Sequence, residues 1–323
     1  MEPFSPRLNL SALAASVDHI RSEVGKIIIG QHALVDHLIG ALLADGHVLI
    51  EGVPGVAKTL SARLLARTVS AGFSRIQFTP DLMPSDVLGT SVFNPESRDF
   101  EFKAGPIFSN IVLVDEVNRA PAKTQSALFE VMEERQVTID GTTYPMVPPF
   151  LVLATQNPLE HEGTYRLPEA QLDRFLFKVE VGYPSEEEEV EMLSGNHAGR
   201  PWQHLDMIEA VLLAEELAGY RDLVRQVHIE PHVIRYIAAL TQRTRNHPSL
   251  YLGASPRASL AMMAGAKAFA AMHGRDFVTP EDVQSVAYPV LRHRILLTAE
   301  LEMEGRRPDA LIKGLLESLD VPR

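Results

Sequence analysis

The chain has 323 residues, of which 46% are hydrophobic, and its formal net charge at pH 7 is −12. This length suits about two domains with sizeable apolar cores, and the acidic balance opposes indiscriminate attraction to DNA, RNA or anionic membranes. The chain contains no cysteine, which excludes disulfides, thiolate nucleophiles and zinc sites with cysteine ligands.

No stretch of the sequence approaches the ~20 consecutive apolar residues that a membrane-spanning helix requires. Residues 1–16 lack the basic start and apolar run of a secretory signal peptide. We therefore expect no membrane insertion and a cytoplasmic location.

An apolar turn near the beginning of the chain, Ile28-Ile29-Gly30-Gln31, precedes a helix with Leu34, Leu38 and Leu42 along one face. Such a turn could cover an adenine ring, with Ile29 and Gly30 in contact with the base. It could equally do no more than lead into the helix, and the sequence leaves both interpretations open.

A glycine-containing turn follows the short apolar run Val48 to Ile50. Gly52 and Gly55 can let backbone amides close around phosphate oxygens. Lys58 can reach the β and γ phosphates, and the Thr59 hydroxyl can ligate Mg²⁺. The residues predicted to contact the nucleotide in this segment are Gly52, Val53, Pro54, Gly55, Val56, Ala57, Lys58, Thr59 and Leu60.

Ala57 stands where the pattern G-x-x-x-x-G-K-[ST] has its second glycine, so the match to that pattern is not literal. The residues after the turn still favour a phosphate site, because Leu60, Leu64, Leu65 and Val69 recur at helical spacing. The alternative is an ordinary glycine-proline turn.

Short apolar runs alternate with helical segments along the first half of the chain. This alternation predicts an α/β fold with a parallel five-stranded sheet between helices. The predicted strands contain Val48 to Ile50, Ile76 to Phe78, Ile111 to Val114, Leu151 to Ala154 and Leu176 to Val181.

Two segments between these strands are predicted to form hairpins. One covers about 80–107, which is rich in proline and aromatic residues, and the other covers about 135–150, centred on Asp140-Gly141. Both could instead be plain surface excursions.

Two carboxylates, Asp115 and Glu116, end the apolar strand that begins at Ile111. The carboxyl ends of parallel strands are where ligands approach an open α/β sheet. Asp115 would hold Mg²⁺ through its water shell together with Thr59, and Glu116 would orient and polarise the attacking water.

Two further polar residues are candidates because of where they lie relative to the strands. Asn157 ends the next strand and could contact the γ-phosphate or the water, although Asn-Pro alone is a common turn. Arg174 comes immediately before the last strand. It could simply pair with Asp173, or it could be an arginine finger that enters the nucleotide site of an adjacent subunit.

The pattern changes to helices alone after Pro184, so we expect a nucleotide-binding core over 1–184 and a helical lid domain over 185–323. Ser185 and Glu188 have the spacing of a capping box. Further helix starts are predicted at Pro231, Ser255-Pro256 and Thr279-Pro280.

Arg257 falls in the first turn of the helix that starts at Ser255-Pro256. A cation there opposes the helix dipole and needs an offsetting partner such as a phosphate. Arg257 is therefore a candidate nucleotide sensor.

In order, several segments make the chain resemble an AAA+ ATPase of the MoxR group, and the resemblance covers nearly the whole chain. The segments are Gly52 to Thr59, Asp115-Glu116-Val-Asn-Arg-Ala, Ala154-Thr-Gln-Asn-Pro and Leu167-Pro-Glu-Ala-Gln-Leu-Asp-Arg-Phe. In that group, alanine before the lysine is a familiar variant. The roles implied by the resemblance are Walker A for Lys58 and Thr59, Walker B for Asp115 and Glu116, sensor 1 for Asn157, the finger for Arg174 and sensor 2 for Arg257.

The resemblance further implies ATP and Mg²⁺ as ligands, a hexameric ring of identical subunits, two inserted hairpins and a helical lid. Relatives are thought to act as chaperone-like machines on protein clients, often with a von Willebrand factor A domain partner. The expected function is thus Mg²⁺-dependent ATP hydrolysis that drives remodelling or maturation of a client.

Three alternatives remain open at the level of the sequence. The first is a nucleic-acid translocase, which the acidic total weighs against, although Lys103, Arg135 and Lys178 could lie near a channel. The second is a nucleotide-gated scaffold that does not hydrolyse ATP. The third is a motor subunit like those of magnesium chelatases.

Overall fold

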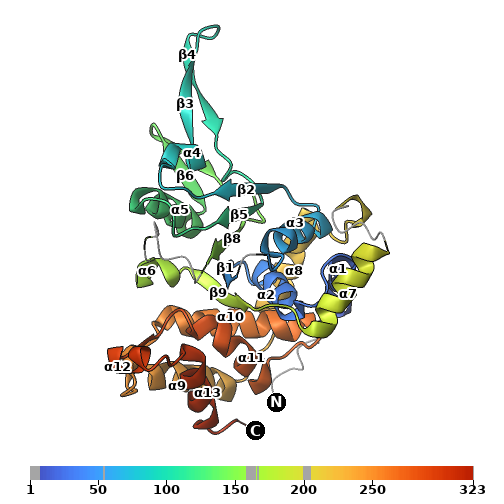
Figure 1. The fold of residues 1–323 in the computed structure, drawn as a ribbon, viewed down its shortest axis with the longest axis vertical. Helices are drawn as coiled ribbons and strands as arrows, with labels where there is room; N and C mark the ends of the chain where they lie inside the picture. The colour runs from blue at the N-terminus through green and yellow to red at the C-terminus, as the bar shows by residue number, and fades with distance from the viewer. Residues whose placement is uncertain (1–7, 54, 158–164, 166, 199–204, 323) are drawn as a thin grey trace, which may run out of the picture.

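A parallel sheet of five strands lies at the centre of the computed structural model, which describes residues 8–53, 55–157, 165, 167–198 and 205–322 (Figure 1). The spatial order of the strands is β2-β5-β8-β1-β9. They are β1 (His47–Gly52), β2 (Phe73–Gln77), β5 (Ile111–Asp115), β8 (Leu151–Gln156) and β9 (Phe175–Val181). Each strand overlaps one of the predicted apolar runs, so the predicted α/β class is confirmed.

Helices cover both faces of the sheet, which explains why the central strands are continuous apolar runs rather than alternating ones. Along β5, Leu113 belongs to the core on one face and Val112 to the core on the other. The first face is covered by α1 (Ser11–Gly25), α2 (His32–Leu43) and α3 (Lys58–Thr68), and the second by α4 (Pro84–Leu88) and α5 (Ala122–Glu134).

Both predicted hairpins are present as antiparallel pairs. The first consists of β3 (Gly89–Asn94) and β4 (Asp99–Ala104) and projects from the body of the molecule (Figure 1). The second consists of β6 (Gln136–Ile139) and β7 (Thr142–Pro145). Phe102 stacks on Tyr144 with ring centroids 4.2 Å apart, so the two hairpins support one another at their bases.

The chain after β9 is mainly helical, but the prediction of helices alone was wrong. Two very short strands pair antiparallel, and a run of two or three residues leaves no periodic signal. The elements are α6 (Glu169–Leu172) before β9, then α7 (Glu186–His197), the 3₁₀ turn η1 (Leu205–Met207), α8 (Ala214–Gln226), α9 (Pro231–Arg245), β10 (Leu250–Leu252), α10 (Pro256–Met272), α11 (Pro280–Leu291), β11 (Leu296–Leu297), α12 (Ala299–Met303) and α13 (Pro308–Glu317).

Helix α10 packs against α2 and helix α11 packs against β9, so these helices lie beneath the sheet in the view of Figure 1. Phe269 of α10 lies against Gly40 of α2, where an added Cβ would come within 2.8 Å of its ring. One apolar core therefore continues from α1 through α11. The division of the chain at residue 184 stays a prediction.

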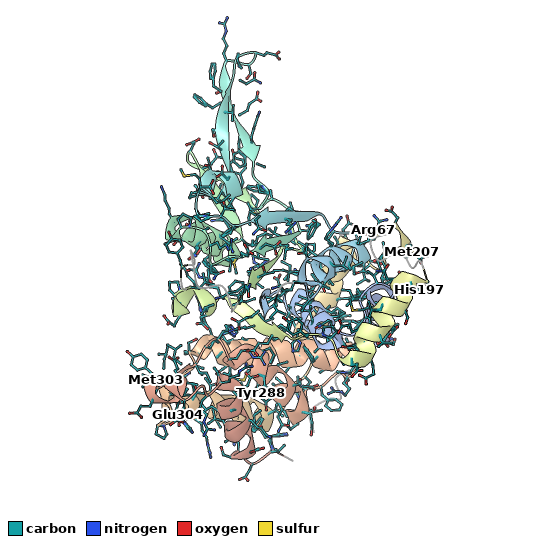
Figure 2. All side chains as sticks on the ribbon, in the orientation of Figure 1. Arg67, His197, Met207, Tyr288, Met303 and Glu304 are labelled. Carbon is teal, nitrogen blue, oxygen red and sulfur yellow. The ribbon has the colours of Figure 1, made fainter. Side chains whose placement is uncertain are left out.

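The segment between α7 and α8 returns across the end of α3. The amide of Val211 donates to the carbonyl of Thr68 at 2.7 Å, which satisfies one of the last carbonyls of that helix. Figure 2 shows Arg67 and Met207 at the same outer corner. At the start of α7, Ser185 and Glu188 form the predicted capping box.

A buried histidine links three elements on the α5 side of the sheet. His47 begins β1; its Nδ1 accepts from the amide of Val152 at 3.0 Å, and its Nε2 donates to the carbonyl of Met132 at 3.1 Å. Burial, together with the nearby Arg135 guanidinium, lowers the pKa of His47 to about 3. The imidazole is therefore neutral in the folded protein at ordinary pH.

We expect acidification to destabilise the fold through His47. Because its pKa in the folded state lies below its ordinary value, the unfolded chain binds the extra proton, and stability falls as the pH drops from about 6.5 toward 3. The loss amounts to about 1.4 kcal/mol per pH unit for each such group. Urea unfolding at pH 7.0 and pH 5.5 measures it, and His47→Gln should show a smaller pH slope. An unchanged slope would assign the effect to other groups.

Within the described ranges, every helix is either too short or too polar to span a lipid bilayer.

Candidate functional site

The turn between β1 and α3 has the backbone shape of a phosphate cradle. Gly55 and Ala57 both adopt positive φ, of 87° and 58°, and Lys58 begins α3. The position that usually holds the second glycine is thus a left-handed one, which Ala57 occupies at a strain of about 1–2 kcal/mol. The Lys58 ammonium donates to the carbonyl of Gly52 at 2.6 Å, so it lies folded over the turn. Pro54, also predicted to contact the nucleotide, lies outside the described residues.

Gly52 is required for a reason that the sequence interpretation missed. A Cβ at this position would lie 2.6 Å from the carbonyl oxygen of Val181 on the neighbouring strand β9. The absence of a side chain therefore permits close strand packing, whereas the prediction explained this glycine by access to phosphate alone.

An apolar cavity of about 280 Å³ adjoins the phosphate turn. Five predicted residues line it, namely Ile29, Gly55, Val56, Ala57 and Leu60. Ile28 and Gln31 of the predicted apolar turn also line it, as do Ile27, Pro184 and Met192, which were not predicted. Pro184 lies just before α7 and Met192 lies within it, far from the phosphate turn in the sequence, so no local pattern could have indicated either residue.

Two further predicted contact residues, Gly30 and Val53, have different neighbours. Gly30 has a φ of 68°, and a Cβ there would clash with the Glu188 carboxylate of α7, 2.2 Å away. Val53 is partly buried and packs against the main core. Both lie next to the cavity in sequence, but neither lines it.

The carboxylate of Asp115 lies at the end of β5, with only 9% of its side chain exposed. The Arg75 guanidinium donates to its Oδ2 through Nε at 2.6 Å, and the Thr155 hydroxyl donates to its Oδ1 at 3.1 Å. Arg75 and Thr155 come from the two strands that flank β5, β2 and β8. Neither was identified from the sequence.

Glu116 follows with a φ of 55°, which turns its side chain out of the strand line. Gln77 of β2 donates through Nε2 to the Glu116 Oε2 at 2.8 Å, and Arg119 lies 3.1 Å from the same oxygen. Arg75 and Gln77 could have been identified from the sequence, because two polar residues at alternate positions of a strand lie on the same face. The register then places them near the acids, since Gln77 pairs with Asp115.

Asn157 comes directly after β8, which lies between β1 and β5. It is 9% exposed. The sheet order therefore brings the phosphate turn, Asn157 and the two acids together at the carboxyl ends of the parallel strands, where ligands bind in open α/β sheets.

Arg174 and Arg257 lie at the opposite end of the strands, on the side of their amino ends. Arg257 Nη2 donates to Glu133 Oε1 at 2.7 Å, and Arg174 Nε lies 3.7 Å from Glu133 Oε2. These contacts differ from two of the sequence-based expectations. The partner that offsets the charge of Arg257 is a carboxylate of α5 rather than a phosphate of the same chain, and Asp173 pairs with Arg294 at 2.7 Å instead of with Arg174.

The register of β1 and β9 gives the distance between the amino ends and the carboxyl ends of the strands. His47 pairs with Phe175, directly after Arg174, whereas Gly52 pairs with Val181 at the other end. Six residues of extended strand span roughly 20 Å. Arg174 and Arg257 thus lie about one strand length from the phosphate turn of their own chain.

Comparisons with known proteins agree with this arrangement. Residues 47–177 match the ATPase family associated with various cellular activities (AAA), and residues 242–315 match the AAA lid domain. The chaperone MoxR1 of Mycobacterium tuberculosis is 44% identical over 97% of this chain and 84% of its own length. This chain is a MoxR-type AAA+ ATPase. It is therefore a nucleotide-binding enzyme that hydrolyses ATP.

Other relatives are similar over almost their full length. The protein YeaC of Bacillus subtilis is 46% identical over 96% of this chain and 95% of its own. A crystal structure of a candidate ATPase from Cytophaga hutchinsonii is 42% identical, covers 97% of both chains and superposes with a TM-score of 0.89. The MoxR resemblance and the AAA+ fold with a helical lid are thus confirmed.

Proposed function

We propose that this MoxR-type ATPase works as a hexameric ring of identical subunits, which uses Mg²⁺-dependent ATP hydrolysis to remodel a protein client. The similarity to a protein named as a chaperone supports the remodelling role. The observation that carries the ring is the separation of Lys58 from Arg174 and Arg257 by about one strand length.

The residues at the phosphate edge are proposed to act on the bound nucleotide as follows. Backbone amides at the start of α3 hold phosphate oxygens, and the Lys58 ammonium turns from the Gly52 carbonyl to the β and γ phosphates. Glu116, held by Gln77, orients the attacking water, and Asn157 contacts the γ-phosphate or that water.

The oxygens of Thr59 and Asp115 fit a magnesium ion, because Mg²⁺ prefers hard oxygen ligands such as hydroxyls and carboxylates. Thr59 occupies the second position of α3 and Asp115 ends β5, at the same edge of the sheet. When bound there, Mg²⁺ would neutralise part of the negative charge on the phosphates of the nucleotide.

The two arginines are proposed to complete the site of an adjacent subunit. Figure 1 shows α6, which precedes Arg174, and α7, which borders the apolar cavity, on opposite sides of the molecule. A head-to-tail ring brings such opposite sides together. Arg174 would then neutralise charge at the transferred phosphate of the neighbour, and Arg257 would contact the same nucleotide.

The apolar cavity is proposed to hold the adenine ring. Placing a carboxylate there by Ile29→Asp should weaken ATP binding roughly tenfold or more, since a charge must be desolvated against the base. Calorimetric titration with ATPγS measures the change, and Ile234→Asp on the exposed face of α9 is the matched control. Unchanged affinity in Ile29→Asp would place the base elsewhere.

Most of the basic residues that could have lined a nucleic-acid channel are engaged by other groups of the protein. Arg135 donates to the carbonyls of Phe150 and Asp45, and burial lowers its pKa. Lys178 pairs with Glu51 at 2.6 Å. Of the three basic residues considered, only Lys103 on the projecting hairpin stays exposed.

The proposed remodelling of a protein client can be tested by asking whether a ring that cannot hydrolyse ATP keeps its client bound. A Glu116→Gln ring loaded with ATP should hold its client, and the same ring without nucleotide should release it. A von Willebrand factor A domain protein among the retained material would identify the proposed partner class. Retention that is independent of nucleotide would argue against an ATP-driven remodelling cycle.

A further inference from the structure

The carboxylate proposed to hold magnesium already has a cationic partner. The guanidinium of Arg75 donates through Nε to Asp115 Oδ2 at 2.6 Å, while the hydroxyl of Thr155 donates to Oδ1 at 3.1 Å. Both carboxylate oxygens are thus engaged by side chains of this chain.

Burial explains why such a partner is needed. The Asp115 side chain is 9% exposed, and a buried carboxylate without a countercharge is strongly unfavourable. The register supports the pairing, because β2 lies beside β5 with Gln77 opposite Asp115. Arg75 lies two residues earlier and therefore on the same face of the sheet.

Arg75 is also free to move away. Its side chain is 54% exposed, and β2 is the edge strand of the sheet, so the guanidinium can leave Asp115 for solvent without disturbing the core. A second cation at the same carboxylate would repel it. The arrangement therefore favours one cation at a time on this oxygen.

We propose that Arg75 is the resident counter-ion of Asp115, which neutralises the carboxylate before magnesium binds and is displaced by the incoming ion. This inference rests on the proposed role of Asp115 as a magnesium-holding residue. Arg75 is a positioning residue in this scheme. It stabilises the protein without the metal and, by competing with it, raises the Mg²⁺ concentration that the site requires.

The competition gives Arg75→Gln a characteristic signature in thermal unfolding. In EDTA the variant should melt a few degrees below wild type, since Asp115 loses its countercharge. With excess ATPγS, the Mg²⁺ concentration that gives half of the thermal shift should fall by about fivefold, the equivalent of one partly exposed ion pair. A purely structural role would lower the melting temperature under both conditions and would not change the Mg²⁺ requirement.

Two further variants keep the test decisive. Arg75→Lys retains the charge, so its Mg²⁺ requirement should change in the same direction by a smaller factor, and this variant serves if Arg75→Gln does not fold. Arg225→Gln removes another exposed arginine, 2.8 Å from Asp222 on α8, and should leave the Mg²⁺ requirement unchanged.

The outcomes separate this inference from the function on which it rests. A higher or unchanged Mg²⁺ requirement in both Arg75 variants would overturn the counter-ion role while leaving the nucleotide site intact. A wild-type protein that shows no Mg²⁺-dependent shift with ATPγS would instead overturn the proposed magnesium site, and the role of Arg75 with it.

Discussion

Replacing Glu116 with glutamine is expected to lower the rate of ATP hydrolysis by roughly 100-fold or more, with little change in nucleotide affinity. Glutamine keeps the size of the side chain and can still meet Gln77, which now contacts the Glu116 carboxylate at 2.8 Å. It cannot polarise a water molecule as a carboxylate does. Steady-state phosphate release measures the rate, and calorimetry with ATPγS measures the affinity.

The control for this substitution is Glu130→Gln, which changes an exposed glutamate on α5 in the same way and should leave turnover unchanged. Near wild-type hydrolysis by Glu116→Gln would remove Glu116 from its proposed catalytic role. Lost nucleotide binding would show that the substitution acts on the fold of the site rather than on the water.

The strands and the phosphate turn could be predicted because their signals are local. A strand buried on both faces must be a short apolar run, as Val48 to Ile50 is, and a turn that holds phosphate must combine positive φ with a lysine at the helix start. Asp115 and Asn157 were proposed for a related reason, since Asp115 ends a recognisable strand and Asn157 directly follows one.

Contacts between residues far apart in the chain could not be predicted from the sequence. Arg257 was assigned to a phosphate because its charge needs a partner, but nothing in its own helix indicates Glu133, which lies 124 positions earlier. Met192 lines the cavity beside Leu60 for a similar reason. Such partners are set by how α7 and α10 pack on the rest of the chain, and one charge can be satisfied by several chemical groups.

The pairing of Arg174 with Glu133 bears directly on how a ring would operate. A finger that is held by a carboxylate of its own subunit must exchange that partner for a phosphate of the neighbour. The same carboxylate also holds Arg257, at 2.7 Å. Glu133 therefore keeps both cations at one edge of the subunit, where a neighbouring nucleotide could recruit them together.

Mixing two inactive variants tests the shared site most directly. Lys58→Ala removes the phosphate-binding lysine, and Arg174→Ala removes the finger, so each protein alone should lose about 100-fold or more of its ATPase activity. In a mixed ring, a site is complete when an intact Lys58 faces an intact Arg174 from the next subunit. Random mixing in equal amounts should complete about a quarter of the sites, if sites act independently.

The expected result is recovery toward a quarter of the wild-type rate after subunit exchange, measured by phosphate release. A mixture of Lys58→Ala with the double variant Lys58→Ala/Arg174→Ala is the matched control and should recover nothing, because no subunit then has an intact lysine. If subunit mixing is verified by labelled subunits and activity still does not return, Arg174 does not act in trans. Its separation from Lys58 by a strand length would then leave it outside the chemical step, as a residue that only anchors the end of α5.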